Sequence, residues 1–250
     1  MSWASVGTLG AGNSISAGTT VAITTSATAE AGNFVLVTVA LDNTGTTDSD
    51  FSEVSSITDS AGGNTWTKCA EYTNGQGSAA AGVTISAWRS ILTNQIASGG
   101  TITANLANSV TSKALSAWEF TLGAGSTVSI AGSVQTRADD AVSLPGAQTI
   151  SGLTSGEYLF VRAVGSENLN TTYTPTTNYT ALTASAADTG TAPTSANTKG
   201  EFRILTGTGD TSDPVSAGAG TPDRVSVYFA LLETPAASFT PFSLFMGAGV

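Results

Sequence analysis

The chain contains no histidine, a single cysteine (Cys69) and only eight lysine and arginine residues among 250. Without histidine there is no imidazole to act as a general base or to bind a metal ion. One cysteine cannot build a thiolate metal site or an internal disulfide framework. We therefore interpret Cys69 as a small buried apolar residue. A glycine-rich phosphate loop followed by lysine is also missing, so the usual nucleotide-binding motif is excluded.

Charge is scarce as well. Charged residues make up 10% of the chain, and the net charge of −10 arises because cations are few rather than because acids are many. Nucleic-acid binding requires clustered Lys and Arg that displace counterions, so a nucleic-acid partner is not expected. No apolar run has the length of a membrane span, and the first residues lack the basic and apolar pattern of a signal peptide. We therefore expect synthesis in a cytoplasm and no membrane partner.

What is present is Ser, Thr, Gly and Ala around short apolar segments of strand length, separated by turn-forming clusters. No segment has the period of a capped helix, so the sequence predicts an all-β protein. Residues 34–37 (FVLV) and 158–161 (YLFV) are apolar on both faces, which predicts central strands covered on both sides. Apolar and polar residues alternate along residues 83–88 (VTISAW), which predicts a half-exposed strand. The clearest predicted strands are residues 33–41, 65–72, 83–92, 101–106, 113–122, 127–134, 157–164, 201–206 and 224–232.

The order of these segments repeats along the chain. Two similar four-stranded halves, at about residues 30–122 and 154–233, predict one jelly-roll-like β-sandwich domain over residues 1–233. Two separate small sandwiches are the alternative. The matched segments are 32–37 (GNFVLV) with 156–161 (GEYLFV), 64–67 with 178–180, 81–85 with 199–204, and 115–120 with 225–229.

Three stretches carry a resemblance to a known family. They are residues 54–67 (VSSITDSAGGNTWT), 83–88 (VTISAW) and 117–120 (AWEF). They resemble the jelly-roll-like β-sandwich modules of tailed-phage virion proteins and bacterial surface proteins, over roughly residues 30–233. The second glycine, Gly63, departs from the pattern and lengthens the turn. The resemblance implies a module that decorates, cements or adheres, and it brings no catalytic motif.

Carboxylates are the remaining candidates for chemistry. A glycosidase needs only two of them, and Glu71, Glu119, Glu157 and Glu201 lie on or beside predicted strands. Solvated outer-face positions, or pairing with nearby Lys and Arg, explain these glutamates better. We therefore assign no catalytic residue.

Calcium is the one metal whose ligand chemistry the sequence offers. Asp42, Asp48 and Asp50 place hard oxygens in one segment, as Ca²⁺ prefers. Their spacing is not that of an EF-hand, and a solvated acidic loop explains the same residues. We predict no metal and no cofactor, and these three aspartates are the calcium candidates.

The last residues, 234–250, form an apolar C-terminal tail after Pro235 stops the final strand. The tail either covers one end of the sandwich or docks into a neighbouring subunit, and the sequence leaves both open. Trp66, Trp88 and Trp118 lie on predicted strands, which favours core packing over a sugar-stacking platform. The predicted interface residues are Trp3, Phe239, Phe242, Leu244, Phe245 and Met246.

Composition and resemblance together predict a structural virion protein of a tailed bacteriophage rather than an enzyme. A capsid decoration (cement) protein that stabilises the head shell by non-covalent contacts comes first. A phage tail or fibre module, or a surface adhesin that binds host glycan, is the alternative. The expected partners are the major capsid protein or other virion proteins and further copies of the chain in a homo-oligomer. The expected location is the virion, after synthesis in the host cytoplasm.

Overall fold

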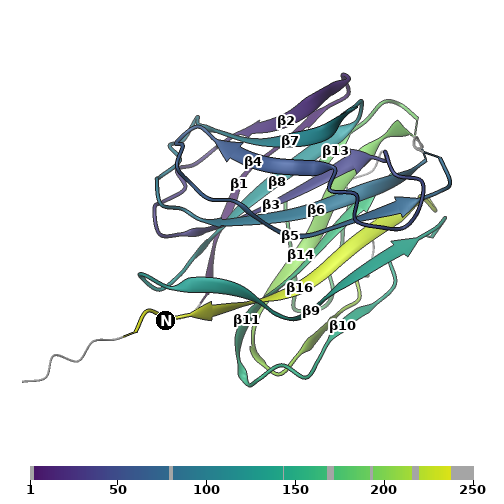
Figure 1. Cartoon of the computed structure of the whole chain (residues 1–250). Helices are drawn as coiled ribbons and strands as arrows, with labels where there is room; N and C mark the ends of the chain where they lie inside the picture. The colour runs from purple at the N-terminus through teal and green to yellow at the C-terminus, as the bar shows by residue number, and fades with distance from the viewer. Residues whose placement is uncertain are drawn as a thin grey trace, which may run out of the picture.

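The computed structural model of the chain describes residues 3–78, 81–142, 144–167, 172–191, 194–215 and 220–237. Within these residues the chain forms sixteen β-strands and no α-helix, and antiparallel sheets pack against one another (Figure 1). The prediction of an all-β protein is confirmed. None of the described residues form a helix with the length and apolarity that a membrane crossing requires.

The first half of the chain forms a five-stranded sheet and a three-stranded sheet. The large sheet has the order β1-β8-β3-β6-β5, and the small one has the order β2-β7-β4. The strands are β1 (Ala4–Ser14), β2 (Gly18–Thr24), β3 (Phe34–Asp42), β4 (Val54–Asp59), β5 (Thr67–Gly75), β6 (Gly82–Ile91), β7 (Thr101–Val110) and β8 (Lys113–Thr121).

The second half forms a second large sheet and a two-stranded sheet. The large sheet has the order β12-β14-β11-β16-β9, with β13 also paired to β14, and β10 pairs with β15. The strands are β9 (Thr127–Asp139), β10 (Gln148–Ile150), β11 (Gly156–Ser166), β12 (Thr180–Ala181), β13 (Ser185–Ala187), β14 (Ala196–Gly207), β15 (Asp210–Ser212) and β16 (Arg224–Thr234).

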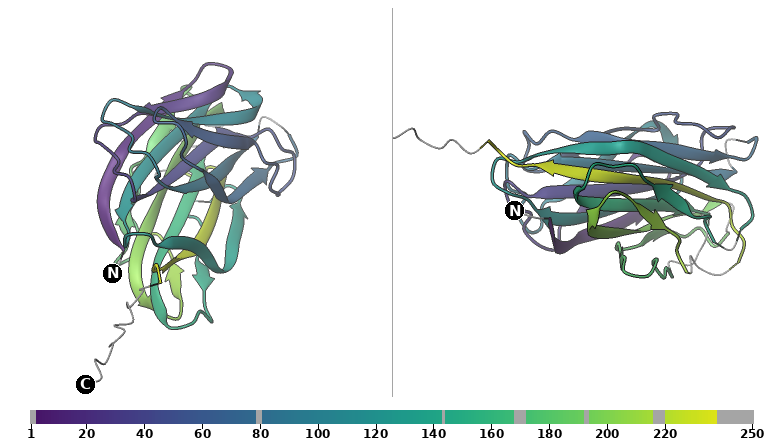
Figure 2. Two further views of the ribbon diagram at one scale, coloured as in Figure 1. Left: turned by 60° about the vertical axis from the view of Figure 1, so that its left-hand side comes forward. Right: turned by 90° about the horizontal axis from the view of Figure 1, so that it is seen from below.

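The four sheets stack as layers, with the two large sheets in the middle (Figures 1 and 2). The main core lies between the large sheets and joins Phe34, Ile85 and Phe120 of the first half to Val161 and Phe229 of the second. A second apolar core fills the space beneath β2-β7-β4. A smaller one, around Phe160 and Tyr228, lies beneath β10-β15.

This layering explains which strands are buried on both faces. The side chains of residues 34–37 and 158–161 are all buried, as their apolar sequences predicted. The alternating segment 83–88 is buried on both faces as well, because the β2-β7-β4 layer covers its second face. Its polar side chains bond to one another and to the neighbouring strand of the same large sheet: Thr84 shares a 2.7 Å hydroxyl–hydroxyl bond with Thr73 on β5, and the Trp88 indole N–H donates to Ser86 Oγ at 2.8 Å.

The two halves have the same strand order. Strand by strand, β1-β8-β3-β6-β5 corresponds to β9-β16-β11-β14-β12. Each half contains more strands than the four expected, because glycine- and threonine-rich segments such as β1 and β2 also pair.

When the sequences of the two halves are aligned, matched residues of β3 and β11 have side chains on opposite faces of their sheets. Phe34 lies in the main core, whereas its sequence counterpart Tyr158 lies in the core beneath β10-β15. Side chains alternate along a strand, so a shift of one residue exchanges the two faces. Val35 faces the core beneath the outer layer of the first half, as Tyr158 does in the second half. In the structure, Val35 rather than Phe34 is therefore the counterpart of Tyr158.

We expect Phe120→Ala to lower the free energy of unfolding by roughly 3–5 kcal/mol. The Phe120 side chain is fully buried, and its ring centroid lies 5.0 Å from that of Phe202 and 6.1 Å from that of Phe34, so it ties the two large sheets together. Denaturant unfolding followed by fluorescence measures the change. Val6→Ala, at a residue 54% exposed on β1, is the control and should change stability by less than about 0.5 kcal/mol. Equal losses in the two variants would contradict the assigned core.

Candidate functional site

Glutamates on the inner strands bind loops rather than face solvent. Glu119 on β8 accepts the backbone N–H of Glu30 at 2.9 Å and the side-chain amide of Asn33 at 2.7 Å. The same arrangement recurs at Glu71 with the N–H groups of Glu53 and Val54, at Glu157 with that of Trp3, at Glu201 with that of Thr176, and at Glu233 with that of Gly123. The structure thus differs from the solvated or cation-paired positions expected for Glu71, Glu119, Glu157 and Glu201. Each of these carboxylates holds a different segment of backbone.

Half of the scarce cations are also internal. Arg162 on β11 is fully buried, and its guanidinium donates to Ser212 O at 3.1 Å, Gly146 O at 2.7 Å and Ser226 Oγ at 3.1 Å. The hydroxyl of Ser212 donates in turn to Glu201 at 2.5 Å. This buried network fastens β15 to the outer face of the second large sheet. The Lys and Arg side chains that are at most 1% exposed are those of Lys113, Arg162, Lys199 and Arg224.

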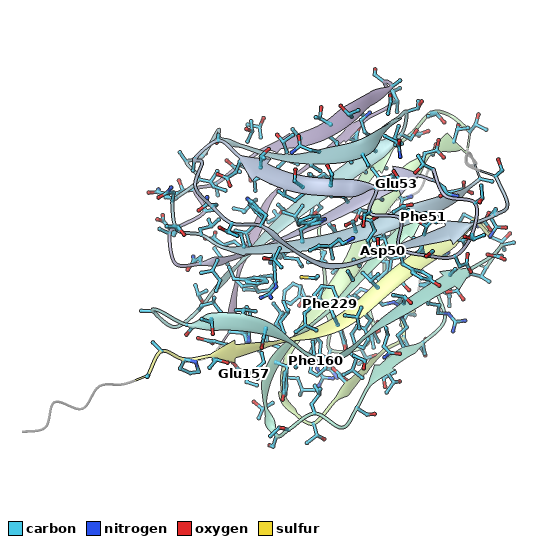
Figure 3. The ribbon with its side chains drawn as sticks, in the orientation of Figure 1. Asp50, Phe51, Glu53, Glu157, Phe160 and Phe229 are labelled. Carbon is cyan, nitrogen blue, oxygen red and sulfur yellow. The ribbon has the colours of Figure 1, made fainter. Side chains whose placement is uncertain are left out.

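The calcium candidates Asp42, Asp48 and Asp50 each have different surroundings. Asp48 accepts the backbone N–H of Gly75 at 2.9 Å, and Asp50 pairs with Lys68 at 3.0 Å. Figure 3 shows Asp50 and Glu53 on the segment that leads into β4. Asp42 is half-buried at the end of β3, and burial raises its pKa to about 6. Among the described residues, no group of three or more Asp, Glu, His or Cys side chains is arranged to hold a metal ion.

A carboxyl pair lies where the two halves meet. Glu167, just after β11, is 5% exposed and accepts the backbone N–H of Gly82 at 2.8 Å. Gly82 opens β6 at φ +86°, and a Cβ there would lie 1.9 Å from Asn74 O, so only glycine fits this approach. Burial, and then the neighbouring carboxylate of Asp223, raise the pKa of Glu167 to about 8. The Glu167 carboxyl therefore holds a proton at neutral pH and hydrogen-bonds Asp223.

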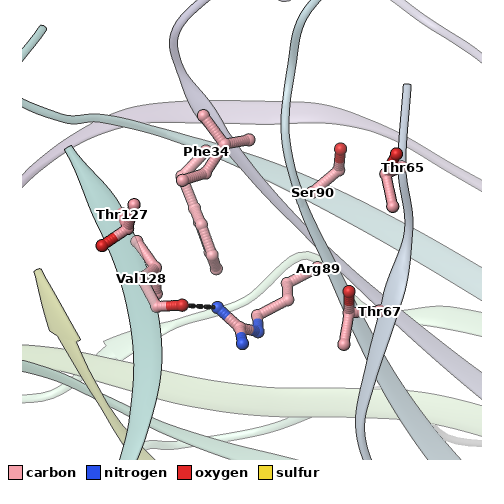
Figure 4. A pocket seen from close by; sticks show the side chains of 8 residues that line it. Phe34, Thr65, Thr67, Arg89, Ser90, Thr127 and Val128 are labelled. Carbon is pink, nitrogen blue, oxygen red and sulfur yellow. Dashed lines mark hydrogen bonds between the residues drawn. The ribbon is translucent and has the colours of Figure 1, made fainter. Parts of the chain in front are cut away.

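A pocket opens at one end of the main core, between β6 and the start of β9 (Figure 4). Its volume is about 260 Å³. Phe34, Ile91 and Val128 form its apolar part, and the guanidinium of Arg89 donates to Val128 O at its floor. The rest of the lining is hydroxylated, from Thr65, Thr67, Ser90 and Thr127.

The outer face of the β2-β7-β4 sheet is exposed and uncharged. Ile102 and Ala104 of β7 point into the core, so Thr103 and Asn105 between and beside them point outward. Across the sheet, Thr103 lies opposite Ala22 of β2 and Thr58 of β4. This face, here called the hydroxyl face, consists of Thr20, Ala22, Thr24, Ser56, Thr58, Thr101, Thr103 and Asn105.

The predicted interface residues fall into two groups. Trp3 is 3% exposed, and its ring packs edge-on against Phe34 at 5.2 Å and Phe120 at 6.3 Å, so it belongs to the main core of its own chain. An interface role for Trp3 stays a prediction. The others, Phe239, Phe242, Leu244, Phe245 and Met246, lie outside the described residues.

The tryptophans expected in the core are buried or half-buried. Trp88 is 7% exposed, and Trp66 and Trp118 pack at the margins of the two larger cores. Trp66 also donates its indole N–H to Asp59 at 2.8 Å.

Comparison of the chain with models of known protein families, with curated proteins and with solved structures finds no match. The resemblance to phage virion modules therefore depends on the sequence motifs alone, and the chain is assigned to no family.

We expect the contribution of Glu167 to the free energy of unfolding to fall by roughly 3 kcal/mol as pH rises from about 5 to about 8. Over this range native Glu167 keeps the proton that an unfolded chain, with its ordinary glutamate pKa near 4.5, releases. The folded state thus binds more protons than the unfolded state, and raising the pH destabilises it. Urea unfolding at half-unit pH steps measures the profile.

Glu167→Gln should remove most of this slope, because the amide cannot ionise beside Asp223. Glu30→Gln, at an exposed glutamate, is the matched control and should keep it. A pH profile that Glu167→Gln leaves unchanged would show that Glu167 is ionised in the folded protein.

Proposed function

We propose that the protein is a structural virion protein of a tailed bacteriophage, acting as a capsid decoration (cement) protein through non-covalent surface contact. The observation that carries the proposal is the hydroxyl face of the β2-β7-β4 sheet. It has no charged side chain, although the chain carries a net charge of −10. Hydroxyl and amide groups are far less costly to remove from water than ions, and they re-form hydrogen bonds with a partner. Such a face suits close, broad contact with another protein surface.

The strand order supports the jelly-roll part of the proposal. In the first half, β1-β8-β3-β6 in one sheet and β2-β7-β4 in the other is the order that two interleaved Greek keys produce. The second half has the same order in its large sheet and pairs β10 with β15 where the first half pairs β2 with β7. We therefore describe each half as a jelly-roll-like unit, rather than the whole chain as one eight-stranded roll.

The proposed partners are the major capsid protein and other virion proteins. A rigid four-layer body has little conformational entropy to lose on docking, and many copies on one shell add weak contacts into strong retention. Homo-oligomer contacts through the same face belong to the proposal. The proposed location is the virion.

Immunogold electron microscopy of particles from a lysate of the natural source tests the location. Label on the heads supports a decoration protein, and label on the tails supports the tail or fibre alternative. Particles without label would overturn both. Binding to a glycan array by the purified protein would instead favour the adhesin alternative.

We expect Thr103→Lys to weaken binding of the purified protein to particles that lack it by at least tenfold. The new ammonium would stand at the centre of the hydroxyl face, between Ala22 and Thr58, and would be desolvated on contact. Cosedimentation with the particles measures the affinity. Thr136→Lys, at an exposed threonine on β9, adds the same charge elsewhere and should bind as the wild type does. Unchanged binding by Thr103→Lys would remove the hydroxyl face from the proposal.

A further inference from the structure

A carboxyl pair at the junction of the two halves holds the bend that follows β9. Asp223, just before β16, accepts the backbone N–H of Ala141 on Oδ1 at 2.8 Å. The carbonyl oxygen of Asp223 accepts the backbone N–H of Glu167 at 3.1 Å. The carboxyl of Glu167 also hydrogen-bonds the Asp223 side chain. A single aspartate thus connects the bend at residues 140–142, here called the β9 exit bend, to the end of β11.

The β9 exit bend is strained at the residue that Asp223 holds. Ala141 has φ +49°, in the left-handed region that residues with a Cβ rarely adopt. Asparagine and aspartate can support this conformation with side-chain hydrogen bonds, whereas alanine has no polar side chain to do so. Backbone strain of this kind persists only where surrounding contacts maintain it, and it is common in segments that switch conformation. Loss of the Asp223 contact would therefore let Ala141 relax.

The surroundings of Glu167 favour its protonated form. Burial raises the pKa of Glu167 to about 8, and the carboxylates of Asp223 and of Asp42, at the end of β3, act in the same direction. The N–H of Gly82, which β6 contributes, acts against them. Because Glu167 is only 5% exposed, water and salt screen the neighbouring carboxylates weakly. The pair therefore carries one proton at neutral pH.

The cations of the neighbouring strands contribute little to the charge at Glu167. The other charged side chains on the surrounding elements are Arg137, Asp139 and Asp140 on or beside β9, Lys199 on β14 and Arg224 on β16. Arg137 pairs with Asp139 at 2.6 Å. Burial, and then the charge of Arg224, lower the pKa of Lys199 to about 7, so Lys199 carries little charge above that pH. None of these cations offsets the carboxylates at Glu167.

We propose that the Glu167–Asp223 pair is a proton-controlled latch on the β9 exit bend. With the proton bound, Glu167 donates to Asp223, and Asp223 keeps Ala141 in its left-handed conformation. Loss of the proton leaves two adjacent carboxylates, which repel each other strongly in a poorly solvated site. Glu167 then keeps the N–H of Gly82, because an ionised carboxylate is the stronger acceptor, and the half-exposed Asp223 turns toward solvent and releases the bend. The latch is closed at neutral pH and opens above about pH 8.

Amide hydrogen exchange of the full chain, with each rate divided by its intrinsic rate at the same pH, tests the latch. Between about pH 7 and about pH 9.5, the protection of the Ala141 and Glu167 amides should fall at least fivefold, because both amides donate to Asp223. The Gly123 amide, which the Glu233 side chain accepts at 2.7 Å, is the internal reference and should stay within twofold.

Substitutions in the pair separate the latch from a general effect of alkaline pH. Glu167→Gln supplies an amide that donates to Asp223 at every pH, so the protection of Ala141 should stay within twofold over the same range. Asp223→Asn should do the same, because its side-chain oxygen still accepts the Ala141 N–H but carries no charge. Glu30→Gln, at an exposed glutamate, is the matched control and should keep the fivefold fall. Ala141→Gly removes the strain and should keep at least threefold more protection than the wild type at about pH 9.5.

Three results would overturn the latch. The first is unchanged protection of Ala141 between the two pH values in the wild type. The second is a fall in Glu167→Gln and Asp223→Asn that equals the fall in the wild type. The third is an equal loss of protection at Gly123, since that would report unfolding of the whole chain. Loss of virion attachment changes none of these readouts, so the latch and the proposed function fail separately.

Discussion

The structure depends on covering both faces of its two large sheets. A strand that is buried on both sides cannot turn its polar side chains to water, so every such group needs a partner inside the protein. Glu119, Glu201 and Arg162 meet this requirement with backbone N–H, hydroxyl and carbonyl groups of loops. The constraint therefore links two features that look unrelated in the sequence: the rarity of charge, and the polar loops between the strands.

The same constraint separates the two halves, despite their common strand order. The outer layer of the first half is a three-stranded sheet over an apolar core. The outer layer of the second half is only β10 and β15, and there a polar network around Arg162 and Glu201 replaces much of the apolar packing. A small outer sheet offers less apolar area, and buried hydrogen bonds hold its loops instead. The first half thus presents a regular outer sheet, whereas a buried polar network holds the outer layer of the second half.

Much of the fold follows from the sequence, because apolar strand segments are conspicuous. Each of the nine predicted strands overlaps an observed one, and the doubly apolar runs at 34–37 and 158–161 are central strands. β1 was not predicted because its glycines and register shifts between Ser5 and Gly7 and between Thr8 and Gly10 hide the period of two. The one-residue shift between the halves is not predicted either, because a sequence alignment of the halves does not show which face of each strand lies in the main core.

The candidate site was less predictable than the fold. A glutamate that accepts loop N–H groups has the same sequence signature as a solvated one, so the roles of Glu71 and Glu119 became evident only from their burial. The pocket draws its lining from β3, β5, β6 and β9, and no local pattern marks residues so far apart in the chain. The hydroxyl face had a visible signal in the alternation of Thr20, Ala22 and Thr24 with Val21 and Ile23, but the sequence does not say that β4 and β7 continue it.

The short link between β8 and β9, residues 122–126, has a consequence for biosynthesis. All hydrogen-bond ladders of the first half are complete once Thr121 has left the ribosome, but the apolar face that holds Phe34, Ile85 and Phe120 waits for strands as far along as β16. At translation rates of roughly 5–20 residues per second, that nascent face stays uncovered for about 6–23 s. We expect its shielding by chaperones during those seconds, more than the stability of the finished molecule, to govern how much soluble protein a cell accumulates.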